Sequence, residues 1–158
     1  MTRLENGQTF PSLHLPRVGG GTVSLPDDLG GDFGVVLVYR GAWCPFCNAQ
    51  LTSFARAQDN LDVLGIKVVA LSVDDEQATS ELVNKRHLTF PVAHSADADK
   101  VADLLGSYVN VEPKYLQSTG FVLAPDGTVL TAVYSTGAIG RLLPDDVVGL
   151  VRHAKGNS

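Results

Sequence analysis

The chain has 158 residues, 44% of them hydrophobic and 18% charged, which is enough apolar material for a folded domain with a substantial core. Its net charge of −5 argues against nucleic acid as the main partner, because phosphate binding needs a basic surface. No apolar stretch approaches the roughly 20 residues of a membrane span, and the first residues lack the apolar segment of a signal peptide. We therefore predict one domain over residues 1–158, with no nucleic-acid or membrane partner and a cytoplasmic location.

The two cysteines, Cys44 and Cys47, lie too close in sequence to form a staple between distant parts of the fold. In a reducing compartment such a pair usually serves metal binding or redox chemistry. Zinc normally takes four ligands, yet there is no second cysteine pair and the histidines stand apart without ligand spacing. We therefore expect no metal and no organic cofactor, and a metal that bridges the pairs of two chains is a weaker alternative.

The chain up to the dithiol predicts an extension followed by a buried strand. Before residue 31, frequent Pro and Gly separate short alternating stretches at 13–15 and 22–25, which predicts a hairpin or surface extension that leads into the core. The continuous run Val35–Tyr39 is typical of a strand buried on both faces. After the dithiol, apolar residues from Cys47 to Leu64 recur at helical spacing, so we expect one helix that closes at Gly65.

The rest of the chain alternates predicted strands with predicted helices. In chain order we expect a strand, a helix, a short strand or extended link, a helix, a hairpin and a last helix, at 67–73, 74–87, 90–93, 97–108, 120–134 and from 144 onward. The hairpin is indicated by the turn Pro125-Asp126-Gly127 between two apolar runs. This order predicts an α/β domain with a mixed central sheet flanked by helices.

The sequence Cys44-Pro45-Phe46-Cys47 follows a predicted strand and a short turn and stands at the start of a helix. Pro45 suits the first helical turn, where its missing N–H is no loss. At such a position the free backbone N–H groups and the helix dipole favour a thiolate and lower a thiol pKa from about 8.5 to between roughly 3.5 and 7.5. The spacing also brings two sulfurs within disulfide reach. We therefore predict a redox-active dithiol rather than two buried cysteines that only pack.

The residues around the dithiol resemble a known superfamily. Trp43-Cys44-Pro45-Phe46-Cys47 looks like the active site of thioredoxins and glutaredoxins, and residues 39–51 are closer still to the peroxiredoxin-like branch, the AhpC/TSA or redoxin group, that carries a Cys-x-x-Cys. Residues 7–13 and 22–25 are similar to that family's N-terminal hairpin, and residues 121–129 to its penultimate strand and turn. The resemblance implies a thioredoxin-like fold and a thiol–disulfide oxidoreductase that reduces peroxides or protein disulfides.

The two analogies assign the cysteines differently. In the peroxiredoxin alignment Cys47 takes the peroxidatic position and Cys44 replaces a Thr, so that Cys47 becomes a sulfenic acid and Cys44 condenses with it. In the thioredoxin alignment Cys44 attacks a substrate disulfide and Cys47 resolves the mixed disulfide. The sequence leaves both assignments open. In either case the resemblance implies electrons from thioredoxin or a small thiol, and relatives of this kind are often homodimers.

The resemblance also marks positions where this chain departs from its relatives. Ser118 stands where a peroxiredoxin carries the Arg that polarises peroxide, and Arg40 substitutes for it if its side chain turns toward the pocket. Thr119 stands at the slot of the thioredoxin cis-proline. The other pocket candidates surround the dithiol: Trp43, Pro45, Phe46 and Gln50. These departures keep open a second reading, in which the fold is a non-catalytic redox sensor or binding module that docks a partner.

Overall fold

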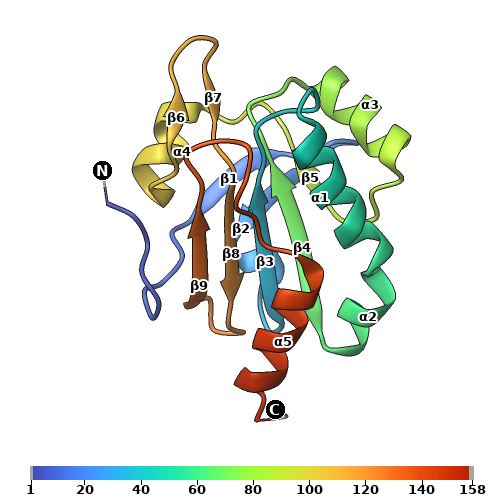
Figure 1. Ribbon diagram of the computed structural model, residues 1–158, viewed down its shortest axis with the longest axis vertical. Coiled ribbons are helices and arrows are strands. Elements are labelled where there is room, and N and C mark those ends of the chain that lie inside the picture. The colour runs from blue at the N-terminus through green and yellow to red at the C-terminus, as the bar shows by residue number, and fades with distance from the viewer. Residues whose placement is uncertain (1, 157–158) are drawn as a thin grey trace.

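A computed structural model describes residues 2–156, and its centre is a five-stranded sheet in the order β5-β4-β3-β8-β9 (Figure 1). The strands are β3 Phe33–Val38, β4 Ile66–Leu71, β5 Val92–Ala93, β8 Thr119–Leu123 and β9 Val129–Tyr134. Strand β3 runs parallel to β4 and antiparallel to β8, so the sheet is mixed, as predicted. The predicted hairpin is the antiparallel pair β8–β9.

Helices cover both faces of this sheet. They are α1 Pro45–Arg56, α2 Gln58–Val63, α3 Glu76–Arg86, α4 Ala98–Leu105 and α5 Pro144–Ala154, with a short 3₁₀ turn η1 at Asp27–Leu29. Side chains alternate along β3, so Val35 and Leu37 pack in one core with α1, α2, α3 and α5, while Val36 and Val38 pack in the other with α4. All four are fully buried, which explains the continuous apolar run in the sequence.

The predicted N-terminal extension is a two-stranded hairpin that closes the second core. Strand β1 Leu13–Pro16 pairs antiparallel with β2 Thr22–Leu25. Leu13 and Leu25 are almost fully buried and belong to the same cluster as Val36 and the helix α4. The hairpin therefore occupies the sheet face that the larger group of helices leaves uncovered.

Two local predictions were wrong, and one small element was missed. The single helix expected up to Gly65 is two helices, because Ala57 leaves helical geometry at ψ 4° and separates α1 from α2. The helix expected over 97–108 ends at Leu105, because Gly106 takes the left-handed conformation at φ +87°. A small hairpin, β6 Val109–Asn110 with β7 Tyr115–Leu116, was not anticipated, since two-residue strands carry no periodic signal.

The prediction of one domain over residues 1–158 stays a prediction, and residues 1, 157 and 158 lie outside the described part of the chain. Within residues 2–156, no helix has the length and apolar character needed to cross a bilayer.

Phe54 tests the packing that fixes α1 on the sheet. Its ring is fully buried, whereas Val63 on α2 is 85% exposed. We expect Phe54→Ala to lower the free energy of unfolding by about 3–5 kcal/mol, because it opens a cavity under α1. Val63→Ala, the control, should stay within about 0.5 kcal/mol. Urea unfolding with an unchanged m-value measures both, and similar midpoints for the two variants would contradict this account of the core.

Candidate active site

The dithiol lies at the corner where the end of β3 leads into α1. Cys44 is the N-cap of α1 and Pro45 is the first helical residue. The Cys44 sulfur accepts the backbone N–H of Cys47 at 3.3 Å, and the Cys47 sulfur accepts the backbone N–H of Arg40 at 3.3 Å. Both cysteines are reduced and fully buried. Each sulfur therefore has a backbone donor in place before any side chain is considered.

Arg40, which directly follows β3 and its flanking Tyr39, turns its guanidinium toward the dithiol. Its Nη1 lies 3.7 Å from the Cys44 sulfur. The rest of the group is held by neutral partners, since Nε donates to Gln117 Oε1 at 3.0 Å and Nη2 to the Tyr115 hydroxyl at 2.9 Å. The sequence made Arg40 a candidate only if its side chain turned toward the site, and in the structure it faces the dithiol.

Arg141 brings a second guanidinium from the loop between β9 and α5. Its Nη2 lies 3.1 Å from the Cys47 sulfur and 3.7 Å from the Cys44 sulfur. Nη1 donates to Gln50 Oε1 at 2.8 Å and Nε to the Ala138 carbonyl at 2.8 Å. Among the described residues neither Arg40 nor Arg141 forms an ion pair with a carboxylate. Both cations therefore act on the sulfurs without a competing anion.

These donors separate the pKa values of the two thiols. Burial opposes a charge on Cys44, but hydrogen bonds from the Cys47 thiol and backbone N–H, together with Arg40 and Arg141, bring the pKa of Cys44 below its ordinary value. Burial and the neighbouring Cys44 sulfur raise the pKa of Cys47, and the Arg40 N–H and Arg141 offset this only in part. The first proton therefore leaves the pair from Cys44, with the Cys47 thiol as a donor to the resulting anion.

Gln50, one turn after Cys47, fixes the loop that carries Arg141. Its Nε2 donates to the Leu142 carbonyl at 2.9 Å, while its Oε1 accepts from Arg141. Because Gln50 is buried, both of its polar atoms need partners, and the loop supplies them. The side chain therefore positions the second guanidinium rather than facing solvent.

Aromatic side chains form a half-exposed rim around the buried sulfurs. Trp43 is 55% exposed and Phe46 52%. Trp43 packs edge-on against Tyr115 of β7, with ring centroids 4.9 Å apart, and the Arg40 guanidinium lies 5.0 Å from the Trp43 ring. The small β6–β7 hairpin thus closes one side of the site through Tyr115.

Two side chains hold the turn before the dithiol through hydrogen bonds to the backbone of Ala42. The Ala42 N–H donates to Asp74 Oδ2 at 2.8 Å, and Asn48 Nδ2 donates to the Ala42 carbonyl at 3.0 Å. Burial raises the pKa of Asp74, although the Ala42 N–H works against this. Gly41 is needed here, because a Cβ at this position would lie 2.1 Å from the Trp43 indole nitrogen.

Thr119 is the first residue of β8 and Ser118 directly precedes it, and neither contacts a sulfur through a hydrogen bond in the described structure. The Ser118 carbonyl accepts the Ser135 N–H, and the Thr119 hydroxyl lies 2.8 Å from the Ser107 hydroxyl and 3.1 Å from the Gln117 carbonyl. Both residues are buried. At both positions these hydrogen bonds are made within the chain, and the guanidiniums that face the sulfurs come from other segments.

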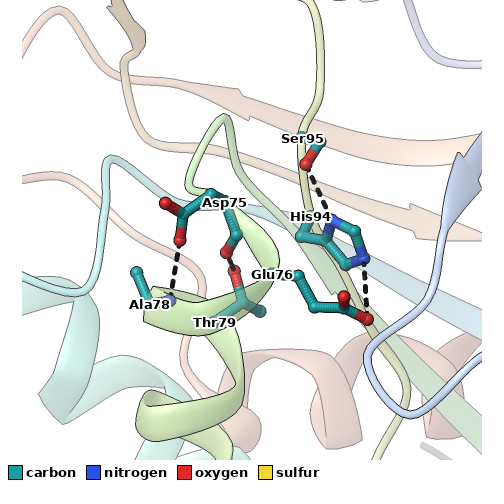
Figure 2. Close-up of polar contacts among 6 residues, drawn as sticks. All are labelled: Asp75, Glu76, Ala78, Thr79, His94 and Ser95. Carbon is teal, nitrogen blue, oxygen red and sulfur yellow. Dashed lines mark hydrogen bonds and ion pairs between the residues drawn. The ribbon is translucent and has the colours of Figure 1, made fainter.

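The acidic segment after β4 caps the helix α3 (Figure 2). Asp75 is the N-cap of α3, and its Oδ1 accepts the Ala78 N–H at 2.8 Å. The nearby His94 lies 2.7 Å from the Ser95 hydroxyl through Nδ1 and 3.6 Å from Glu76 through Nε2. Across residues 2–156, no group of three or more His, Cys, Asp or Glu side chains is arranged to hold a metal ion.

Comparison with known proteins agrees with this geometry. The sequence model of the AhpC/TSA family matches residues 6–132, which is most of the chain and includes both cysteines. The chain belongs to the AhpC/TSA family. It is therefore a thiol-dependent oxidoreductase, as the sequence predicted, and the alternative of a non-catalytic sensor is not favoured. Arg141 lies beyond the matched segment.

Related proteins cover nearly the whole chain. The peroxiredoxin of Methanothermobacter thermautotrophicus is 26% identical over 152 residues, 92% of this chain and 71% of that protein. The peroxiredoxin of Treponema denticola is 26% identical over 147 residues, 89% of this chain and 69% of that protein. The crystal structure of Mycobacterium tuberculosis peroxidoxin BcpB matches with a TM-score of 0.83 at 21% identity, over 96% of this chain and 98% of that one. The thioredoxin-like fold is thus confirmed.

Sequence reasoning missed Arg141, Tyr115 and Gln117. These residues lie far from the dithiol in the chain, in a loop and at the small hairpin, and no motif links them to it. One available signal was the position of Arg141 in a Gly-containing loop directly before an apolar segment and a helix.

Removing Arg141 should raise the pKa of Cys44. In a Cys47→Ser background a single thiol titrates, and Arg141→Gln removes a cation that stabilises its anion, so the titration midpoint moves to higher pH. The ultraviolet absorbance of the thiolate measures this midpoint. Arg152→Gln, which removes an exposed Arg in the last turn of α5, should leave it unchanged. A midpoint that stays fixed or falls in the Arg141 variant would contradict this electrostatic account.

Proposed function

We propose that this chain reduces hydroperoxides by cycling between the Cys44–Cys47 dithiol and its disulfide. The observation that carries the proposal is the convergence of two guanidiniums, from Arg40 and Arg141, on the two sulfurs, neither of them paired with a carboxylate among residues 2–156. Breaking an O–O bond puts negative charge on the leaving oxygen, and fixed cations at that place lower the barrier. The complete burial of both sulfurs favours a small substrate over a folded protein disulfide.

We assign the attack on peroxide to Cys47. Arg141 lies closest to its sulfur, and the Arg40 N–H donates to it. The pair shares one proton through the Cys44–Cys47 hydrogen bond, and when Cys44 holds that proton the Cys47 thiolate, beside Arg141, attacks one peroxide oxygen. The O–O bond breaks, Cys47 becomes a sulfenic acid, and the other oxygen leaves as hydroxide or alkoxide beside the guanidiniums. With the shared proton on its sulfur, Cys44 remains a thiol during the attack and is ready for the resolving step.

Cys44 then resolves the sulfenic acid. Its sulfur attacks the Cys47 sulfur, the S–O bond breaks, and water leaves with the proton that Cys44 had taken up. The two residues lie within the first turn of α1, so this step needs no large rearrangement of the chain. The disulfide is reduced by a dithiol donor of the thioredoxin type or by a small thiol, whose own thiols are oxidised to a disulfide.

The cellular compartment of the proposed cycle follows from its need for a reduced thiol donor. We place it in the cytoplasm, as the sequence predicts, because that compartment maintains thiol donors in the reduced state. Exposed aromatic side chains beside the dithiol, Trp43 and Phe46, are suited to contact the donor. A homodimer stays a prediction from the family resemblance.

Trapping sulfenic acid tests the assignment of the cysteines. With one equivalent of hydrogen peroxide, the Cys44→Ser variant should form a sulfenic acid on Cys47 that dimedone captures, because serine keeps a hydroxyl donor but cannot resolve. The Cys47→Ser variant should react slowly, and mass spectrometry locates the adduct. Rapid capture on Cys44 instead would reverse the assignment. Slow and equal oxidation of both variants would contradict the peroxidase activity and favour disulfide exchange in which Cys44 attacks first.

Steady-state turnover with hydrogen peroxide and a thioredoxin system tests the role of the cations. Arg141→Gln should lower kcat/KM for peroxide by about 100-fold, because it removes a preorganised donor to the leaving oxygen. Arg152→Gln should retain the wild-type value. Oxidation of the wild type that stops after one equivalent would rule out an enzyme that cycles, and full activity in the Arg141 variant would rule out its role in the reaction.

A further inference from the structure

Unpartnered polar atoms concentrate on the surface between α1 and α3. Within residues 2–156, five buried side-chain atoms have no hydrogen-bond partner, and three of them lie here: Asn48 Oδ1, Thr52 Oγ1 and Arg86 Nε. Asn48 and Thr52 are one turn apart on α1, and Arg86 is in the last turn of α3. Buried polar atoms in folded proteins are nearly always paired, with the chain or with ordered water, so three unpartnered atoms at one place mark a polar site that water or a ligand can occupy.

The same surface is hollowed. Three hollows of about 620, 260 and 210 Å³ have Arg86 in their lining. The first two share Thr52 and Arg56, and the third reaches Asn48 and the active-site residue Ala42. We call this feature the α1–α3 groove, defined by Asn48, Thr52, Arg56, Lys85, Arg86 and His87. It has room for a small molecule beside the orphaned atoms.

The groove is positively charged in a chain whose net charge is −5. Arg56, Lys85 and Arg86 line it, and none of the three forms an ion pair in the described structure. Two carboxylates, Glu81 and Asp145, line two of the same three hollows, so the cations outnumber the anions there by three to two. Cations in the last turns of α1 and α3 also stabilise the helix dipoles, but that role does not require an unpaired guanidinium nitrogen or an unpaired hydroxyl.

We propose that the α1–α3 groove binds the phosphate group of a small phosphorylated molecule. A tetrahedral phosphate accepts hydrogen bonds from several directions, which suits two guanidiniums, an ammonium and the Thr52 hydroxyl better than a planar carboxylate does. Asn48 Oδ1 is an acceptor, so it binds a hydroxyl or N–H elsewhere on the ligand. Apart from Asn48, which also holds the turn at Ala42, the residues of the groove lie outside the active site described above, and the proposal does not depend on the proposed peroxidase activity.

Titration of the reduced full-length chain with inorganic phosphate and with pyrophosphate tests the proposal, in chloride buffer at constant ionic strength. We expect saturable binding, with amide NMR shifts centred on residues 48–56 and 85–87. Arg86→Gln and Arg86→Lys should each weaken binding about tenfold, because both remove the Nε donor. Arg152→Gln, which removes the same charge elsewhere, should bind like the wild type. Thermal unfolding without phosphate checks that each variant is folded.

Thr52→Val removes only a hydroxyl, and it should also weaken binding, which keeps the test valid if the Arg86 variants do not fold. Equal weakening by Arg152→Gln, or shifts that rise linearly without saturation, would show charge screening only and overturn the proposal. Shifts confined to the surroundings of Arg40 and Arg141 would place the anion at the dithiol and overturn it as well.

Discussion

The chemistry of this protein depends on two backbone N–H groups that point at sulfur. The Cys47 N–H is a free donor of the first turn of α1, and the Arg40 N–H is the first donor beyond the buried strand β3 and Tyr39. Both are fixed only if strand and helix keep their mutual orientation. Val35 and Leu37 under α1, together with Phe54 on the helix, provide that orientation through a fully buried apolar contact.

Segments remote in sequence then complete the electrostatics of the pair. The guanidinium of Arg141 comes from the loop before α5, and that of Arg40 is held by Gln117 and Tyr115. Gln50 accepts a hydrogen bond from the Arg141 guanidinium and so links it to α1, the helix that carries the dithiol. The arrangement is therefore preorganised, because each cation has neutral hydrogen-bond partners that hold its direction without cancelling its charge.

The features that depend only on neighbouring residues in the chain could be predicted from the sequence. The apolar run 35–39, the N-capping Cys44 and the helix-starting Pro45 predicted the strand, the turn and the dithiol, because each depends on neighbours in the chain. Breaks at Ala57 and Leu105 were missed, since apolar spacing continued across them and only the backbone conformation changed. Arg141 and Tyr115 could not be assigned to the site, because their approach to the sulfurs depends on the tertiary fold.

The lack of a carboxylate partner for either guanidinium also bears on the redox equilibrium of the pair. In the dithiol state the two cations face a thiolate, whereas in the disulfide state they face two neutral sulfurs. The reduced state thus has an attraction that the oxidised state lacks, and its stabilisation raises the reduction potential of the couple. Such a disulfide is a comparatively strong oxidant toward thiols, so donors readily restore the dithiol. Formation of the disulfide is correspondingly less favourable, and the strongly favourable reduction of a peroxide can drive it.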